Sequence, residues 1–90
     1  GIKMKTKKII IIDPIGIHAR PASAIVNATS KFASKIEFKH DGKLANAKSI
    51  INLMALGIKK DAELEIIVDG SDEEEAINTL VEVMEKEKLI

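Results

Sequence analysis

The sequence predicts an α+β protein of two layers, in which helices cover one face of a single sheet and the other face is open to water. Short segments rich in β-branched residues alternate apolar and polar side chains, as half-buried strands do. Two longer segments place apolar residues at three- and four-residue intervals, as one side of a helix does. The segments follow one another in the order βαββαβα, and residues 1–90 suffice for a single domain with one core.

The first strand and the first helix are expected on either side of a turn. Residues 7–12 are rich in isoleucine, and Asp13-Pro14 ends this run. The segment HARPASAIVNATSKFA then carries apolar side chains at helical spacing. Because a proline fits a helix only in its first turn, Pro21 places the start of this helix near His18.

The middle of the chain predicts a hairpin. Residues 35–40 alternate between apolar and polar side chains, as a strand with one buried face does. Asp41-Gly42 is a strong signal for a tight turn, and residues 43–46 form the returning strand.

The second half of the chain predicts a short helix, a strand and a long helix. Ser49 can cap a helix over residues 50–56, which Gly57 can close. Residues 63–69 alternate as the last strand. The final helix opens with Ser71 and Glu74 at the spacing of a capping box, and one apolar stripe runs along it, made of Ile77, Leu80, Val81 and Met84.

Composition excludes several classes of protein. The chain has no cysteine, which excludes a disulfide scaffold and a thiolate zinc site, and its longest apolar runs are too short to insert into a membrane. With two phenylalanines and no other aromatic residue, it lacks the stacking platforms typical of single-strand nucleic acid binders. We therefore expect a cytoplasmic monomer without cofactor that binds no nucleic acid. Residues 1–3 precede Met4 and resemble a remnant of cloning.

Charge is distributed unevenly along the sequence. Residues 1–48 contain ten Lys or Arg and three Asp or Glu, whereas residues 49–90 contain four and eleven. The net charge is zero. The sequence thus predicts a dipolar molecule whose basic half meets acidic partners.

The heptapeptide GIHARPA, residues 16–22, has the residue types of a phosphoryl site. At the start of a helix, the amides of Ala19 and Arg20 have no intrahelical acceptor, and the helix dipole adds about half a positive charge. The guanidinium of Arg20 suits phosphate oxygens, and a histidine can bond a phosphoryl group covalently. Gly16 leaves space for a bulky phosphodonor.

Other polar residues carry weaker signals. Asp13 is the one carboxylate near enough to His18 in the sequence to hold its imidazole. His40 lies beside a hairpin tip and is expected to be solvated surface. With two distant histidines and no cysteine, we expect no metal site. The acidic run at residues 72–75 suits the start of a helix rather than catalysis.

Two motifs carry a resemblance to a known family. The segment GIHARPA resembles the active-site signature of HPr, the histidine-containing phosphocarrier of the bacterial sugar phosphotransferase system. The segment KSIINLMALGI, residues 48–58, resembles the serine-phosphorylation segment of the same family. The resemblance extends over nearly the whole chain. It implies an open-faced β-sandwich whose four antiparallel strands lie in the order 1-4-2-3 under three helices.

The resemblance also implies roles and partners. His18 would accept a phosphoryl group on Nδ1 from phosphorylated enzyme I and pass it to IIA domains of sugar permeases, without being a self-sufficient enzyme. Arg20 would neutralise the phosphoryl charge, and Pro21 with the backbone amide of Ala19 would fix the geometry. Ser49 would be the target of a serine kinase/phosphorylase, and a transcriptional regulator would be a further partner. Ile15 departs from the small polar residue that many relatives carry before the glycine.

The short helix predicts a docking patch, because its apolar residues outnumber those that two turns can bury against a sheet. Ile50, Ile51 and Met54 are expected to remain exposed for partners. An alternative function is a regulatory binding module that acts mainly through Ser49, although family members of that kind typically lack the histidine. A nucleotide-turnover enzyme is a third alternative, for which the chain has no phosphate-binding loop.

Overall fold

The computed structural model describes residues 4–90, so the expectation that residues 1–3 are a cloning remnant concerns residues outside this range. Strands and helices alternate along the described chain as the sequence predicts. In chain order they are β1 (Lys5–Ile10), α1 (Ala19–Thr29), β2 (Lys35–His40), β3 (Lys43–Asn46), α2 (Ile50–Ala55), β4 (Glu63–Asp69) and α3 (Glu73–Lys86).

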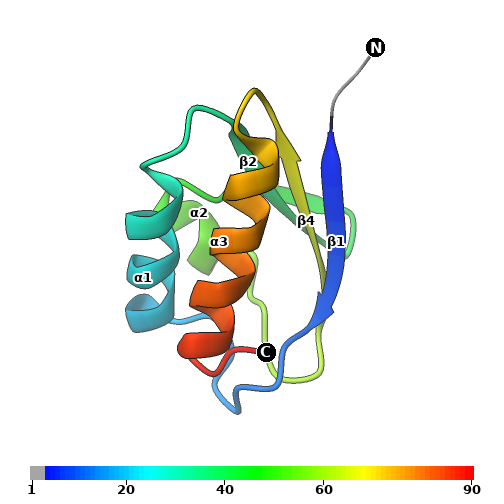
Figure 1. Ribbon diagram of the computed structural model, residues 1–90. Coiled ribbons are helices and arrows are strands. Elements are labelled where there is room, and N and C mark those ends of the chain that lie inside the picture. Colours follow the sequence, from blue (N-terminus) through cyan, green and yellow to red (C-terminus); the bar gives the residue numbers. More distant parts are fainter. Residues whose placement is uncertain (1–3) are drawn as a thin grey trace.

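The sheet has the predicted order β1-β4-β2-β3, with every neighbouring pair antiparallel. The helices lie on one face of the sheet and leave the other face open (Figure 1). The prediction of a two-layer open-faced α+β fold is therefore confirmed. No helix formed by residues 4–90 is long and apolar enough to cross a membrane.

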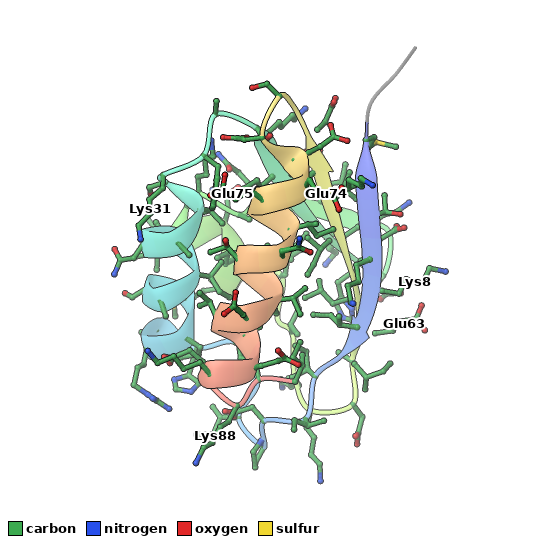
Figure 2. The ribbon with its side chains drawn as sticks, in the orientation of Figure 1. Lys8, Lys31, Glu63, Glu74, Glu75 and Lys88 are labelled. Carbon is green, nitrogen blue, oxygen red and sulfur yellow. The ribbon has the colours of Figure 1, made fainter. Side chains whose placement is uncertain are left out.

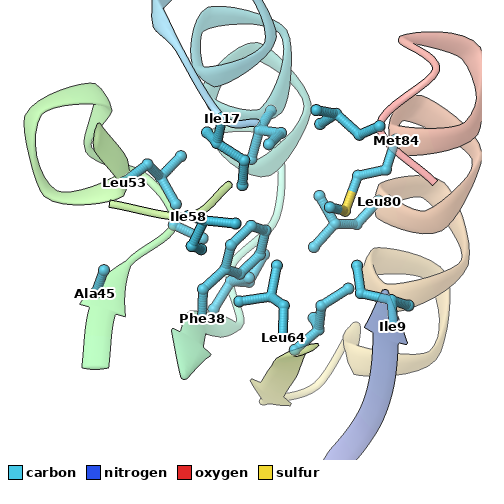
Figure 3. Packing of buried hydrophobic residues seen from close by; sticks show 14 of the residues in the cluster. Ile9, Ile17, Phe38, Ala45, Leu53, Ile58, Leu64, Leu80 and Met84 are labelled. Carbon is cyan, nitrogen blue, oxygen red and sulfur yellow. The ribbon is translucent and has the colours of Figure 1, made fainter. Parts of the chain in front are cut away.

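The core lies between the sheet and the helices. Phe38 of β2 is fully buried near its centre, with Leu64 of β4 on one side and Leu80 and Met84 of α3 above it (Figure 3). The predicted alternation holds in the two inner strands, whose core residues are Ile36, Phe38, Leu64, Ile66 and Val68. This register fixes which face of the sheet the helices cover, because a slip of one residue would turn the apolar side chains to water.

β1 ends two residues earlier than the sequence predicts. Ile11 is fully buried but leaves the ladder with β4, since its N–H donates to the carbonyl of Ala62 at 3.0 Å. The N–H of Ile12 then donates to the carbonyl of Leu89 at 2.7 Å, near the C-terminus. The chain thus turns toward the helical layer while its backbone remains hydrogen-bonded, which a pattern of apolar residues does not reveal.

The expected capping box of the last helix is wrong. The N-cap is Asp72, and the carboxylate of Glu73 accepts the N–H of Gly70 at 3.2 Å. Glu74 forms an ion pair with Lys5 of β1 at 2.8 Å, which raises the pKa of that lysine. The carboxylate of Asp72 turns to the loop before β2, where it accepts hydrogen bonds from both the backbone and the side chain of Ser34. Tertiary contacts therefore determine where the acidic side chains of this turn point.

The fold brings acidic side chains of the second half of the sequence beside basic side chains of the first half. The acidic strand β4 lies between the basic strands β1 and β2, so that Glu65 is paired with Lys8 on one side and Lys39 on the other. Ion pairs also join the halves, for example between Lys8 and Glu63 at 4.0 Å (Figure 2). Strand order therefore determines which of these opposite charges become neighbours.

Candidate functional site

His18 is the N-cap of α1, as the sequence predicts. Its backbone is extended, with φ −114° and ψ −170°, and its carbonyl accepts the N–H of Ala22 at 3.0 Å, the first hydrogen bond of the helix. Pro21 is the third helical residue and is buried, so its missing N–H leaves no donor unpaired. His18 is half-buried and its side chain forms no capping hydrogen bond. The imidazole is therefore not engaged in holding the helix.

The loop before His18 is held by Asp13. Its carboxylate accepts the N–H of Ile15 at 2.8 Å and the N–H of Gly16 at 3.2 Å. The carboxylate thus stabilises the turn that leads to the helix, and within residues 4–90 it forms no hydrogen bond with the imidazole of His18. Ile15, the departure from the family pattern, is 68% exposed at the tip of this turn.

Gly16 has a different role from the one that the sequence suggests. It is buried, with φ +84°, and a Cβ atom there would lie 2.2 Å from the carbonyl oxygen of Ile58 and 2.6 Å from Cα of Lys59. The N–H of Ile17 donates to the same carbonyl at 3.1 Å. The glycine therefore permits close contact between the site loop and the segment after α2, rather than leaving space for a donor at the surface.

Arg20 lies beside the end of α3. Its guanidinium is 72% exposed and lies 3.6 Å from the carboxylate of Glu87, the C-cap of that helix. Both residues line an open cavity of about 490 Å³ between the site loop and the C-terminal turn. Sequence reasoning missed Glu87, because no local pattern connects it to a residue 67 positions earlier.

Ser49 is the N-cap of α2, as the sequence predicts. Its hydroxyl accepts the N–H of Asn52 at 3.3 Å and the side-chain N–H of the same residue at 2.9 Å. The preceding Lys48 donates to the carbonyl of Phe32 at 2.7 Å, which connects this segment to the end of α1. The serine is half-buried and accessible at the surface.

α2 presents an exposed apolar patch, formed by Ile50, Ile51 and Met54. These side chains are 37%, 80% and 44% exposed, whereas Leu53 of the same helix is fully buried. The segment that follows this helix is hydrogen-bonded to the loop before His18, through the carbonyl of Ile58 and the N–H of Ile17. Such a group of exposed apolar side chains is typical of a surface that binds other proteins.

His40 lies at the end of β2 and contacts β4. The ring of His40 is half-buried, and its Nδ1 lies 3.0 Å from the carbonyl of Glu63, so it connects the hairpin to β4 in addition to contacting solvent. In the chain from Met4 to Ile90, no group of three or more His, Asp or Glu side chains is arranged to hold a metal ion.

A histidine at a helix N-terminus with an arginine two residues later has the chemistry of a phosphoryl site, and comparison with known proteins decides the family. The family model described as "PTS HPr component phosphorylation site" matches residues 5–86. The chain belongs to the HPr family. A phosphocarrier protein HPr of Mycoplasma pneumoniae is 47% identical over 88 residues, which are 97% of this chain and 100% of that protein.

Solved structures of the HPr family have the same fold. A histidine-containing phosphocarrier protein of Mycoplasma superposes with a TM-score of 0.94 at 41% identity, over 96% of this chain and 98% of that one. The catabolite repression protein Crh of Bacillus subtilis, described as a swapped dimer, superposes with a TM-score of 0.74 at 36% identity, over 93% and 97%. As a member of this family, the chain is a phosphocarrier of the phosphotransferase system.

Proposed function

We propose that His18 accepts a phosphoryl group on Nδ1 from phosphorylated enzyme I, and that it passes the group to IIA domains of sugar permeases. The observation that carries this proposal is the position of an imidazole free of capping contacts at the N-cap of α1. We expect the exchange to take place in the cytoplasm.

The helix start supplies the electrostatics for the transfer. The amides of Ala19 and Arg20 belong to the first turn and have no intrahelical acceptor, so they can donate to phosphoryl oxygens. The helix dipole stabilises the negative charge of a phosphoryl group by about 0.3–1 kcal/mol at an exposed site. In loading, the Nδ1 lone pair bonds to phosphorus while the bond from phosphorus to the donor breaks, and the electron pair stays on the donor. Unloading reverses these roles.

Arg20 can leave Glu87 for the phosphoryl group at little cost. The pair is 3.6 Å apart and the arginine is largely exposed, so the contact contributes at most about 1 kcal/mol. A phosphoryl group brings nearly two negative charges and a geometry suited to bidentate hydrogen bonds. We therefore assign Arg20 to charge stabilisation after loading and Glu87 to holding it near the site before loading.

The test of the carrier is phosphorylation from phosphoenolpyruvate by enzyme I. We expect one acid-labile phosphate per chain, lost in His18→Ala and retained in Ser49→Ala. The matched control is His40→Ala, because His40 is the other histidine of the chain. Incorporation that persists in His18→Ala, or that is lost in His40→Ala, would overturn the assignment.

We further propose that phosphorylation at Ser49 regulates these exchanges. A phosphate on this N-cap would add nearly two negative charges at the start of α2, beside the patch of Ile50, Ile51 and Met54. The helix tolerates negative charge at this end, so the effect falls on partners that dock there. Enzyme I and IIA domains would bind less well, whereas a serine kinase/phosphorylase and a transcriptional regulator would recognise this segment.

The second candidate is a regulatory module that acts mainly through Ser49, and the similarity to Crh favours it. The presence of His18 with Arg20 supports the carrier instead. The phosphorylation assay separates the two, since a purely regulatory module takes up no phosphate from phosphoenolpyruvate.

A further inference from the structure

Lys88 occupies a backbone conformation that lysine rarely adopts. Its φ is +61°, and the other non-glycine residues with positive φ among residues 4–90 are two aspartates, Asp41 and Asp61. Short polar side chains tolerate this region, whereas a lysine meets the full steric penalty of its Cβ. The backbone preference of lysine therefore does not explain why a lysine occupies this position.

The end of α3 has the hydrogen bonds of a Schellman motif. The N–H of Lys88 donates to the carbonyl of Glu85 at 3.0 Å, and the N–H of Leu89 donates to the carbonyl of Met84 at 2.9 Å. The side chain of Leu89 is fully buried, which completes the motif. Glycine is the usual residue at the position of Lys88, so this chain retains a charged side chain where glycine would relieve strain.

Lys88 lines the cavity of about 490 Å³ that also contains Arg20. Figure 2 shows the lysine at the end of α3, directed away from the ribbon. The acidic groups of this cavity are engaged: Asp13 accepts two loop amides, and Glu87 pairs with Arg20. Lys86 and Lys88 are exposed and form no ion pair within residues 4–90, so the free charges of the cavity are positive.

We propose that Lys88, supported by Lys86, binds a carboxylate of the protein that loads His18. The inference rests on the proposed carrier function and adds to it a specificity-determining contact. A partner that reaches His18 and Arg20 must cover the adjoining cavity, whose exposed apolar wall is Ile12. Strain retained beside a functional site is expected where the strained side chain contributes to binding.

The test compares Lys88→Gly with the unchanged protein in steady-state loading by phosphorylated enzyme I at low salt. We expect the melting temperature to rise by about 2–5 °C, because glycine relieves the backbone strain. The KM of enzyme I for this chain as phosphoryl acceptor should rise about 2–5-fold with kcat unchanged, since an exposed docking charge acts on encounter and binding. The KM difference should shrink at 0.5 M salt.

Further variants distinguish the effect of the Lys88 charge from the effect of its backbone conformation. Lys88→Arg should retain the original KM, because the charge is kept. Lys88→Asn should raise KM as glycine does, because asparagine tolerates positive φ but carries no charge. Asp41→Gly relieves a positive φ at the hairpin tip, and its KM should not change. An unchanged KM in both Lys88→Gly and Lys88→Asn at low salt would overturn the inference. A fall in kcat by the same factor as the rise in KM would also overturn it. Failure of the carrier function itself gives a different result, in which the unchanged protein takes up no phosphate.

Discussion

Gly16 and Gly42 have nearly the same backbone conformation in different surroundings. Their φ angles are +84° and +80°, but a Cβ atom on Gly42 would meet no heavy atom within 4 Å. On Gly16 it would meet the backbone of Ile58 and Lys59. Backbone atoms cannot move aside as the end of a flexible side chain can. Alanine substitutions at the two glycines therefore distinguish the energetic cost of a left-handed backbone from that of a steric clash.

We therefore predict different losses of stability for alanine at these two positions. Gly42→Ala should lower the free energy of unfolding by about 1 kcal/mol, from the left-handed backbone alone. Gly16→Ala should lower it by at least about 2 kcal/mol more, because the loop before His18 must move away from the segment after α2. Urea denaturation measures both, and equal losses would contradict the packing role of Gly16.

Substitutions at Ser49 can change the charge at the start of α2 while keeping a residue that caps the helix well. Serine, aspartate and asparagine are about equally good N-caps, so Ser49→Asp and Ser49→Asn should each change the free energy of unfolding by less than about 0.5 kcal/mol. Loading at His18 should slow by about 5-fold in the aspartate variant and remain unchanged in the asparagine variant, because only the aspartate repels an acidic partner. If both variants load at the same rate, the regulatory proposal loses its electrostatic basis.

At the scale of elements, one carboxylate connects the start of α3 to the loop before β2. Asp72 accepts the N–H of Ala33 at 2.8 Å and the N–H of Ser34 at 2.9 Å, and the hydroxyl of Ser34 donates to the same carboxylate. The Ser34 hydroxyl, followed by the amide of Ala33, lowers the pKa of Asp72 below its ordinary value. Ionised Asp72 therefore stabilises the folded chain.

The sign of this shift determines a pH dependence. Since the pKa is lower in the folded than in the unfolded chain, the contribution of Asp72 is complete above the unfolded value of about 3.9 and is lost as the pH falls through the folded value. We predict that Asp72→Asn is less stable than the unchanged protein at pH 7, and that the difference narrows below about pH 4.

Denaturation at several pH values measures this difference. Glu75→Gln is the control, because Glu75 belongs to the same helix turn and forms no ion pair or side-chain hydrogen bond within the described chain. A difference for Asp72→Asn that stays constant from pH 7 to pH 3 would show that its carboxylate does not stabilise the fold through ionisation.

At the scale of the whole molecule, strand order determines how charges meet. Glu65 of β4 is directly opposite Lys8 of β1 and Lys39 of β2 on the open face of the sheet. Directly opposite residues on one face interact, attractively for unlike charges and repulsively for like charges. A single acidic residue therefore separates two lysines that the topology places in one row.

Charge reversal at this position tests the arrangement. Glu65→Lys should lower the free energy of unfolding by about 1–2 kcal/mol at low salt, because two attractive pairs become repulsive. Glu65→Gln, which removes the charge without reversing it, should cost about half as much. Both losses should diminish in 1 M salt, where charges are screened beyond about 3 Å. A loss for Glu65→Lys that is independent of salt would assign the effect to packing instead.

Features that depend on neighbouring residues could be predicted from the amino-acid sequence. Alternation and the Asp41-Gly42 turn predicted β2 and β3 with their observed bounds, and Pro21 placed His18 at the start of α1. These features follow from the steric limits of a few consecutive residues, so a single chain suffices to predict them. The resemblance of GIHARPA to HPr then indicated the family.

Features that depend on residues far apart in the chain could be seen only in the folded protein. The end of β1, the orientation of the Asp72 carboxylate and the contact between Arg20 and Glu87 each join segments that no local pattern relates. The placement of acidic β4 between two basic strands likewise follows from topology. Backbone preference acts over a few residues, whereas hydrogen bonds, charges and steric contacts act between whichever groups the packed core brings together.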